Sequence, residues 1–108
     1  MANPVFKNFA LSGVGTSAQV GYTAPSGKTS VLIQLDIANM KNAPVQVWVY
    51  MNKGGTPYYL VNGAEISVGG TLQAIYGQKQ VLTQNDAILV KTSVSGGVDV
   101  IGSVTEDV

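Results

Sequence analysis

Two alternating runs, residues 29–40 and 44–52, constrain the fold of this chain more than any other stretch. Because the side chains of a strand point alternately to its two faces, an apolar residue at every second position gives each run one aliphatic face. We expect these faces to pack against a second layer of sheet. The aliphatic positions are Val31, Ile33, Leu35 and Ile37 in the first run and Val45, Val47, Val49 and Met51 in the second.

The remaining chain predicts further short strands separated by turns. Turn signals recur about every 8–12 residues, and no segment carries a 3.6-residue apolar stripe of helical length. This pattern predicts one all-β domain, a jelly-roll-like β-sandwich of about eight short antiparallel strands. The other expected strands cover residues 17–24, 58–61, 65–68, 71–76, 80–82, 87–94 and 98–104, with turns at Asn62-Gly63 and Gly69-Gly70 and an acidic tail at 106–108.

We expect residues 1–16 to form an N-terminal arm or an edge strand, ahead of a sandwich domain at residues 17–108. The segment is apolar at Val5, Phe6 and Phe9. An edge strand tolerates the proline near its start. An arm would instead pack on a neighbouring subunit, and both alternatives remain open.

The surface carries unusually little charge. Charged residues make up 11% of the chain, whereas soluble domains average about 25%. A lone monomer uses charge to keep its surface solvated, so we expect part of this surface to be covered in the working state. The alternative is a small soluble domain whose surface is kept polar by Ser, Thr, Asn and Gln.

Several classes of function find no support in the residue content. The chain has no cysteine and no histidine, and therefore neither thiolate nor imidazole chemistry. The acids Asp36, Glu65, Asp86 and Asp99 lie on separate expected elements, and nothing pairs two of them as glycosidases require. The lysines are scattered singly and there is no arginine, unlike the clustered cations of nucleic-acid-binding proteins. We expect no enzymatic activity, no cofactor, no metal site and no nucleic-acid partner.

Membrane association is not expected either. No apolar run reaches transmembrane length, and the first residues lack a charged-then-apolar signal pattern. We therefore expect synthesis in the cytoplasm and no membrane partner.

Aromatic residues on the mixed strand faces predict an interaction surface. If the aliphatic face of residues 44–52 is core, Trp48 and Tyr50 point outward, where aromatic side chains can anchor a protein interface. We expect the neighbouring run to add Gln34 and Asp36 to the same face. Alternatives are a sugar-binding site and a second core layer under a folded-back arm. The interface candidates are Val5, Phe6, Phe9, Gln34, Asp36, Gln46, Trp48, Tyr50, Tyr58 and Tyr59.

Residues 25–106 resemble a family of small virion proteins of tailed bacteriophages. The motifs that carry the resemblance are Pro25-Ser26-Gly27-Lys28-Thr29, Ile37-Ala38-Asn39, Tyr58-Tyr59-Leu60-Val61, Gly77-Gln78-Lys79-Gln80-Val81-Leu82, Asp86-Ala87-Ile88-Leu89-Val90 and Val98-Asp99-Val100-Ile101. The resemblance implies a virion component with a β-sandwich fold, of the kind that decorates or cements a capsid. It names no catalytic residue, and residues 1–16 lie outside it.

Together these observations predict a non-enzymatic structural protein of a bacteriophage virion. We expect a capsid cement or decoration subunit on the capsid surface that stabilises the assembled shell. Its expected partners are the major capsid protein and further copies of itself, as a homodimer or homotrimer. The alternatives are a tail, neck or fibre component and a module that binds glycans of the host surface.

Overall fold

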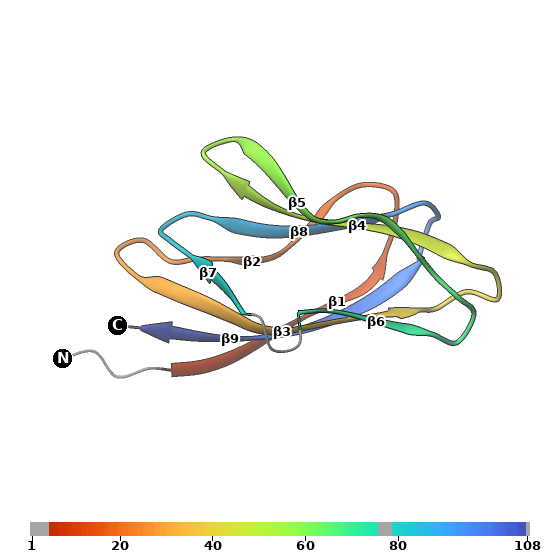
Figure 1. Cartoon of the computed structure of the whole chain (residues 1–108), viewed down its shortest axis with the longest axis horizontal. Coiled ribbons are helices and arrows are strands. Elements are labelled where there is room, and N and C mark those ends of the chain that lie inside the picture. Colours follow the sequence, from red (N-terminus) through yellow and green to blue (C-terminus); the bar gives the residue numbers. More distant parts are fainter. Residues whose placement is uncertain (1–4, 76–78, 108) are drawn as a thin grey trace.

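The described residues, 5–75 and 79–107 of a computed structural model, form nine strands and no helix (Figure 1). The all-β prediction is therefore confirmed. The strands are β1 (Val5–Val14), β2 (Gln19–Thr23), β3 (Thr29–Asn39), β4 (Val45–Lys53), β5 (Thr56–Ile66), β6 (Thr71–Ile75), β7 (Gln80–Leu82), β8 (Ala87–Thr92) and β9 (Val98–Asp107).

The strands form two antiparallel sheets that face each other. The five-stranded sheet has the order β1-β9-β3-β6, with β7 also pairing with β3, and the four-stranded sheet has the order β2-β8-β4-β5. The pairs β1/β9, β2/β8, β3/β6 and β4/β5 are nested, so that the first strand meets the last and the middle strands form the innermost hairpin. This nesting, with successive pairs alternating between two sheets, is the jelly-roll topology. The prediction of a jelly-roll-like sandwich is confirmed.

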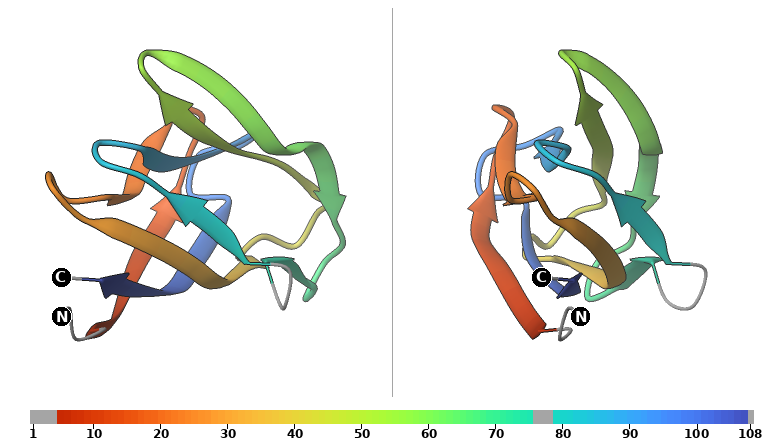
Figure 2. Two further views of the ribbon diagram at one scale, coloured as in Figure 1. Left: turned by 60° about the vertical axis from the view of Figure 1, so that its left-hand side comes forward. Right: turned by 90° about the vertical axis from the view of Figure 1, so that its left-hand side faces the viewer.

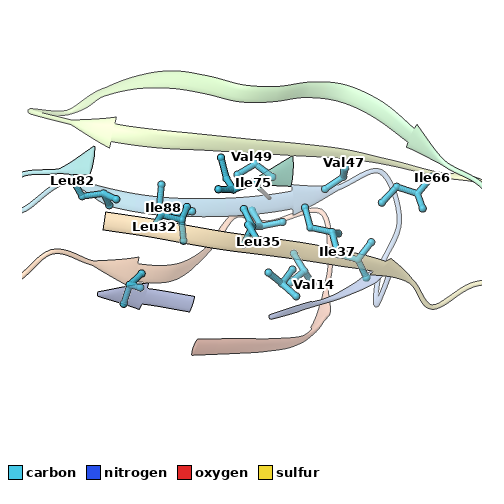
Figure 3. Packing of buried hydrophobic residues seen from close by; sticks show 14 of the residues in the cluster. Val14, Leu32, Leu35, Ile37, Val47, Val49, Ile66, Ile75, Leu82 and Ile88 are labelled. Atoms are coloured by element: carbon cyan, nitrogen blue, oxygen red, sulfur yellow. The ribbon is translucent and has the colours of Figure 1, made fainter. Parts of the chain in front are cut away.

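The hydrophobic core lies between the two sheets. Leu32, Leu35 and Ile37 of β3 point toward Val47 and Val49 of β4, and all five side chains are fully buried (Figure 3). Burying one aliphatic side chain of this size contributes about 1.5–3 kcal/mol to folding. The aliphatic faces predicted from alternation therefore do supply the core, with one correction in β3.

The correction is a β-bulge in β3. Leu32 pairs with Val104 and Gln34 with Ser103, so one extra residue, Ile33, lies between two consecutive pairs. Because an extra residue reverses which side chains face the core, Leu32 is buried and Ile33 turns to the outer face. The predicted core face is therefore right for Leu35 and Ile37 and wrong for Val31 and Ile33. Simple alternation assumes a regular strand and cannot reveal where a bulge lies.

A second bulge replaces the turn predicted at Asn62-Gly63. β5 runs unbroken through this dipeptide, and Gly63 occupies the extra position between the Val47–Ala64 and Trp48–Asn62 pairs. Gly63 has a φ of 76°, which a bulge of this kind requires as much as a hairpin turn does. The separate strand predicted at 65–68 is therefore wrong, while Gly69-Gly70 does lie in a turn, closed by a bond from the Gly70 N–H to the Ser67 carbonyl (2.9 Å).

The chain's two ends carry long strands. β1 lies at one edge of the five-stranded sheet and pairs only with β9, along Val5–Val14. β9 extends to Asp107, so the predicted acidic tail is wrong: Glu106 belongs to the sheet and is buried. Tyr76, expected at the end of a strand, lies outside the described residues, and β6 ends at Ile75.

Candidate functional site

The structure separates the predicted interface residues onto two opposite faces. β3 belongs to the five-stranded sheet and β4 to the four-stranded sheet, and the two sheets form separate layers (Figure 1). Asp36 alternates with the buried Leu35 and Ile37, and Trp48 with the buried Val47 and Val49, so the two side chains lie on opposite outer faces. The expectation that Gln34 and Asp36 share a face with Trp48 and Tyr50 is wrong. The connection at residues 40–44 crosses from one layer to the other, and alternation within each run cannot distinguish such a crossing from a hairpin.

A row of apolar and aromatic side chains crosses the outer face of the four-stranded sheet. Strand register places Val20 beside Leu89, Leu89 beside Tyr50, and Tyr50 beside Tyr59. The Tyr50 and Tyr59 rings lie 5.2 Å apart between centroids. Val20 is 52% exposed and Tyr59 47% exposed. These four residues, hereafter the aromatic row, span all four strands and leave apolar surface open to solvent.

Trp48 lies next to this row and is a surface residue. Its indole packs against Gly63, where an added Cβ would stand 3.3 Å from Nε1, and Lys91 Nζ lies 5.5 Å from the ring centroid on the neighbouring strand. A cation–π contact at such a site contributes about 0.5–1 kcal/mol. Gln46, on the same face, is exposed. The prediction of an outward-facing Trp48 is confirmed.

The paired tyrosines point to opposite sides of β5. Tyr59 joins Tyr50 on the outer face, whereas Tyr58 pairs with Met51, whose side chain packs against the core. Tyr58 is nevertheless 54% exposed. The β4–β5 hairpin projects beyond the rest of the sandwich, so this part of β5 has no opposite layer to cover it (Figure 2).

β1 also directs its aromatic side chains to opposite faces of its sheet. Phe6 is on the outer face and 77% exposed, whereas Phe9 points inward, and its ring packs against Gly102 of β9 and Gly21 of β2. Phe9 also stacks on Tyr22, with ring centroids 5.9 Å apart. Val5 is exposed at the open end of the inner face. Phe9 thus joins the edges of the two sheets, and Phe6 is free to contact another molecule.

Two hollows lie on the outer face of the five-stranded sheet. The larger, about 490 Å³, is lined by residues of β1, β9 and β3 and by Thr71 at the start of β6. The smaller, about 260 Å³, is lined by residues of β1, β3 and β9 nearer the start of β1, among them Phe6 and Ile33. The sequence analysis did not predict these hollows. The only sequence feature that indicates the larger one is the presence of small residues, Ala10, Ser12 and Ala38, at outward positions of β1 and β3. The larger hollow is lined by Ala10, Leu11, Ser12, Asp36, Ala38, Thr71, Asp99, Val100 and Ile101.

One buried polar cluster ties four strands together between the sheets. Glu106 of β9 is 2% exposed; it accepts a hydrogen bond from the Tyr22 hydroxyl and pairs with Lys7 Nζ at 3.0 Å. The Tyr22 hydroxyl also shares a 2.8 Å hydrogen bond with Ser30. The bonds from Tyr22 and Lys7 hold the pKa of Glu106 below its usual range, and burial together with Glu106 raises the pKa of Tyr22 to about 12. The Glu106 carboxylate is thus held within the fold by Tyr22 and Lys7.

A second buried acid, Asp86, closes the turn between β7 and β8. It accepts hydrogen bonds from the Thr83 N–H (2.9 Å) and hydroxyl (3.0 Å) and from Lys53 Nζ (3.2 Å). Burial acts to raise the pKa of Asp86, but the bonds from Thr83 and Lys53 outweigh it and hold that pKa below its usual range. The role of Asp86 is structural.

Within residues 5–75 and 79–107, no three acidic side chains gather closely enough to hold a metal ion. The same part of the chain contains no helix that is long and apolar enough to cross a membrane.

The comparisons with known proteins show the fold. No protein-family model matches the chain, and no curated protein matches it in sequence. Among solved structures, a chain from the acid-stable capsid of Helicobacter pylori bacteriophage KHP30 is 11% identical, with a TM-score of 0.62 over 100% of this chain and 94% of that one. A chain of the IBDV viral particle is 12% identical, with a TM-score of 0.60 over 97% of this chain. This chain spans 31% of that viral chain.

A third similar structure does not come from a virus. A chain of the Bacillus endospore appendages, which form a family of disulfide-linked pili, is 12% identical, with a TM-score of 0.55 over 99% of this chain and 88% of that one. The chain therefore has the jelly-roll sandwich that is also found in viral capsids and in a pilus.

Proposed function

We propose that this protein is a structural subunit of a bacteriophage virion, and specifically a cement or decoration protein on the capsid surface. The observation that carries the proposal is the similarity to the KHP30 capsid chain, which extends over 100% of this chain and 94% of that one. The sequence resemblance to small tailed-phage virion proteins supports the same class of function. The pilus chain has the same fold in another assembly of repeated subunits.

The proposed mechanism is the addition of buried contact area at joints between capsid subunits. A subunit that binds only the assembled shell stabilises that shell by linkage, because its binding free energy is lost when the shell comes apart. Stable protein interfaces bury about 1,200–2,000 Å² in total, and their centres contain few charged residues. The aromatic row is uncharged and partly exposed, and we propose it as the centre of a self-association surface in a homodimer or homotrimer.

Counting copies per particle tests the location in the virion. Quantitative mass spectrometry of purified virions should find hundreds of copies, and cryo-electron microscopy should trace the chain on the outer shell. A dozen copies or fewer would favour the tail, neck or fibre alternative. Absence from the particle would overturn the proposal.

Two neighbouring tyrosines provide a matched test of the self-association face. Tyr59→Ser removes an aromatic group from the aromatic row, whereas Tyr58→Ser removes one of similar exposure from the other side of β5. Sedimentation should show a weaker oligomer for Tyr59→Ser and an unchanged oligomer for Tyr58→Ser. Equal weakening, or a wild-type monomer at high concentration, would contradict this assignment.

Glycan binding is the second candidate, because the outward Trp48, Tyr50 and Tyr59 rings could stack on sugars and jelly rolls also occur in lectins. A glycan array tests it directly. A specific signal that Trp48→Ala abolishes would favour this candidate, and an empty array would remove it.

A further inference from the structure

The larger hollow on the five-stranded sheet exists because small side chains surround a larger one. Strand register places Ala10 beside Ile101 and Ala38 beside Asp99, on the outer face of β1, β9 and β3. Ile101 is exposed in the middle of this surface. The hollow thus offers apolar surface from Ala10, Ala38 and Ile101 beside the polar side chains of Ser12, Asp36 and Asp99.

The charges at this hollow are all of one sign. Asp36 and Asp99 both line it, and no lysine is among the described residues that do so. Neither acid belongs to the two described ion pairs, Lys7–Glu106 and Lys53–Asp86. Asp36 pairs with Ile101, two residues from Asp99 on β9, so the acids are diagonal neighbours. Such neighbours lie about 7–8 Å apart, which lets one cation stand between two carboxylates.

The hydrogen bonding of these acids is incomplete. Asp99 Oδ1 accepts the Gly13 N–H at 2.9 Å, and Asp36 Oδ2 accepts the Gln34 amide at 2.6 Å. Asp36 Oδ1 is enclosed without a hydrogen-bond partner among the described residues, a state that is unfavourable for a polar atom. A turn about the soft χ2 torsion would present this oxygen to an arriving N–H donor.

We propose that this hollow binds a lysine or arginine side chain carried on an extended segment of a neighbouring protein subunit. The cation lies between Asp36 and Asp99, and its aliphatic stem covers Ile101, since such stems pack well on apolar surface. That the neighbour is another virion protein rests on the proposed function. The charge and shape of the hollow do not depend on it.

The smaller hollow sets the length of the segment. The two hollows follow β1 from Phe6 to Ser12, which corresponds to about 20 Å of extended chain. A segment of about six residues therefore fits, with its basic residue at the Asp36 end. At the other end, Phe6 and Ile33 offer apolar contacts to an aliphatic or aromatic side chain. Lys7, which also lines this hollow and is paired with Glu106, disfavours a second basic residue there.

A probe titration tests the binding chemistry without any particle. The probes are capped tripeptides, Ala-Arg-Ala and the same peptide with neutral citrulline in place of arginine, added at millimolar concentration to the labelled full-length chain. NMR should show saturable shifts at Ala10, Ala38 and Ile101 with the arginine peptide only. Equal shifts with both peptides, or shifts confined to the four-stranded sheet, would overturn the proposal.

The variant Asp36→Asn/Asp99→Asn tests the role of the two charges. Asparagine keeps an oxygen for the Gly13 and Gln34 donors, so the fold and melting temperature should not change. Loss of two charge-assisted contacts should weaken arginine-peptide binding about tenfold or more. Glu65→Gln, on the outer face of the four-stranded sheet, is the matched control and should bind as the wild type does. Undiminished binding by the double variant would refute the role of the carboxylates.

Attachment to virions separates this inference from the proposed function. Double-variant subunits should occupy fewer sites on shells than wild-type subunits do, with the deficit shrinking at high salt. Full attachment of the double variant would overturn the inference and leave the virion role standing. Peptide binding by a protein that is absent from virions would overturn the proposed function alone.

Discussion

Two carboxylates on β9, those of Glu106 and Asp99, differ in burial and in hydrogen bonding. Glu106 faces the core, is almost fully buried, and is bonded to Tyr22 and Lys7. Asp99 faces outward beside an apolar hollow and takes part in no described ion pair. Seven positions along the strand separate them, an odd number, so alternation places them on opposite faces of the sheet.

The difference teaches how to tell a structural acid from an available one. Burial obliges a charge to find partners within the fold, because an unpaired buried charge is costly. Glu106 has such partners, because its carboxylate bonds to Tyr22 of β2 and Lys7 of β1 and so links these strands to β9. Asp99 and Asp36 are only partly buried and belong to neither of the two described ion pairs. The five-stranded sheet thus has an inner side that stabilises the fold and an outer side that carries the hollow proposed for binding.

The largest effect expected from this contrast concerns β3. Leu35→Ala removes a fully buried side chain between the sheets and should lower the free energy of unfolding by about 2–5 kcal/mol. Ile33→Ala, on the bulge and turned outward, should cost less than half as much. Chemical denaturation of both variants measures the two values. Equal losses would place Ile33 in the core and remove the bulge.

Gly102 and Ser103 offer a second inner–outer pair. A Cβ at Gly102 would clash with the Phe9 ring, which is held between Gly102 and Gly21. Gly102→Ala should therefore destabilise the protein by about 1–3 kcal/mol, a typical cost of overpacking. Ser103→Ala, on the outer side, should change stability by less than about 0.5 kcal/mol. Thermal unfolding of the two variants compares them, and a neutral Gly102→Ala would mean that the ring is free to move.

The two acids themselves give a smaller difference. Glu106→Gln keeps the shape but weakens the bonds from Tyr22 and Lys7, and should lower the free energy of unfolding by about 1–2 kcal/mol. Asp99→Asn should change it by less than about 0.5 kcal/mol. Urea denaturation at pH 7 measures both. A larger loss for Asp99→Asn would reverse the distinction between a structural and an available acid.

Lowering the pH should reduce the stability that the buried acids Glu106 and Asp86 contribute. The pKa values of Glu106 and Asp86 are depressed in the folded state, so their stabilisation is present above the unfolded values, about 4. It is lost as the pH falls through the folded values. The melting temperature should stay level from pH 7 to about 5 and fall below about 4, less steeply in Glu106→Gln. An identical acid profile in wild type and variant would exclude Glu106 as a cause.

Alkaline conditions act through Tyr22. Its pKa is raised to about 12, so the neutral hydroxyl is favoured by folding. The resulting stability is intact below about pH 10 and declines as the pH rises toward 12. Tyr22→Phe should lack this component of the decline in a melting series.

The sequence predicted the sandwich because its signals are local and repeated. Alternation in residues 29–40 and 44–52, together with regular turns, was enough for an all-β jelly roll. The bulges at Ile33 and Gly63 could not be predicted, since each depends on the register with a partner strand. The glycine at position 63 correctly indicates a positive φ, but both turns and bulges use glycines with positive φ, so it does not distinguish them.

The candidate surfaces were only partly predictable for a related reason. The outward direction of Trp48 and Tyr50 follows from the aliphatic face beside them. That Asp36 lies in the opposite layer, next to Asp99 and distant in sequence from it, follows only from the pairing of β3 with β9. Likewise, Glu106 resembles an exposed tail residue until β9 is placed between β1 and β3.

The central place of β9 between β1 and β3 has a consequence for the order of events during translation. β9 leaves the ribosome after the other eight strands, and until then β1 has no pairing partner in its sheet. Pairing of such distant segments is intrinsically slow. Because Glu106 and Asp99 both lie on β9, neither the contacts of Glu106 with Tyr22 and Lys7 nor the acidic hollow can be complete before β9 has joined the sheet. A nascent subunit therefore cannot engage a partner through the hollow before its own sandwich has closed.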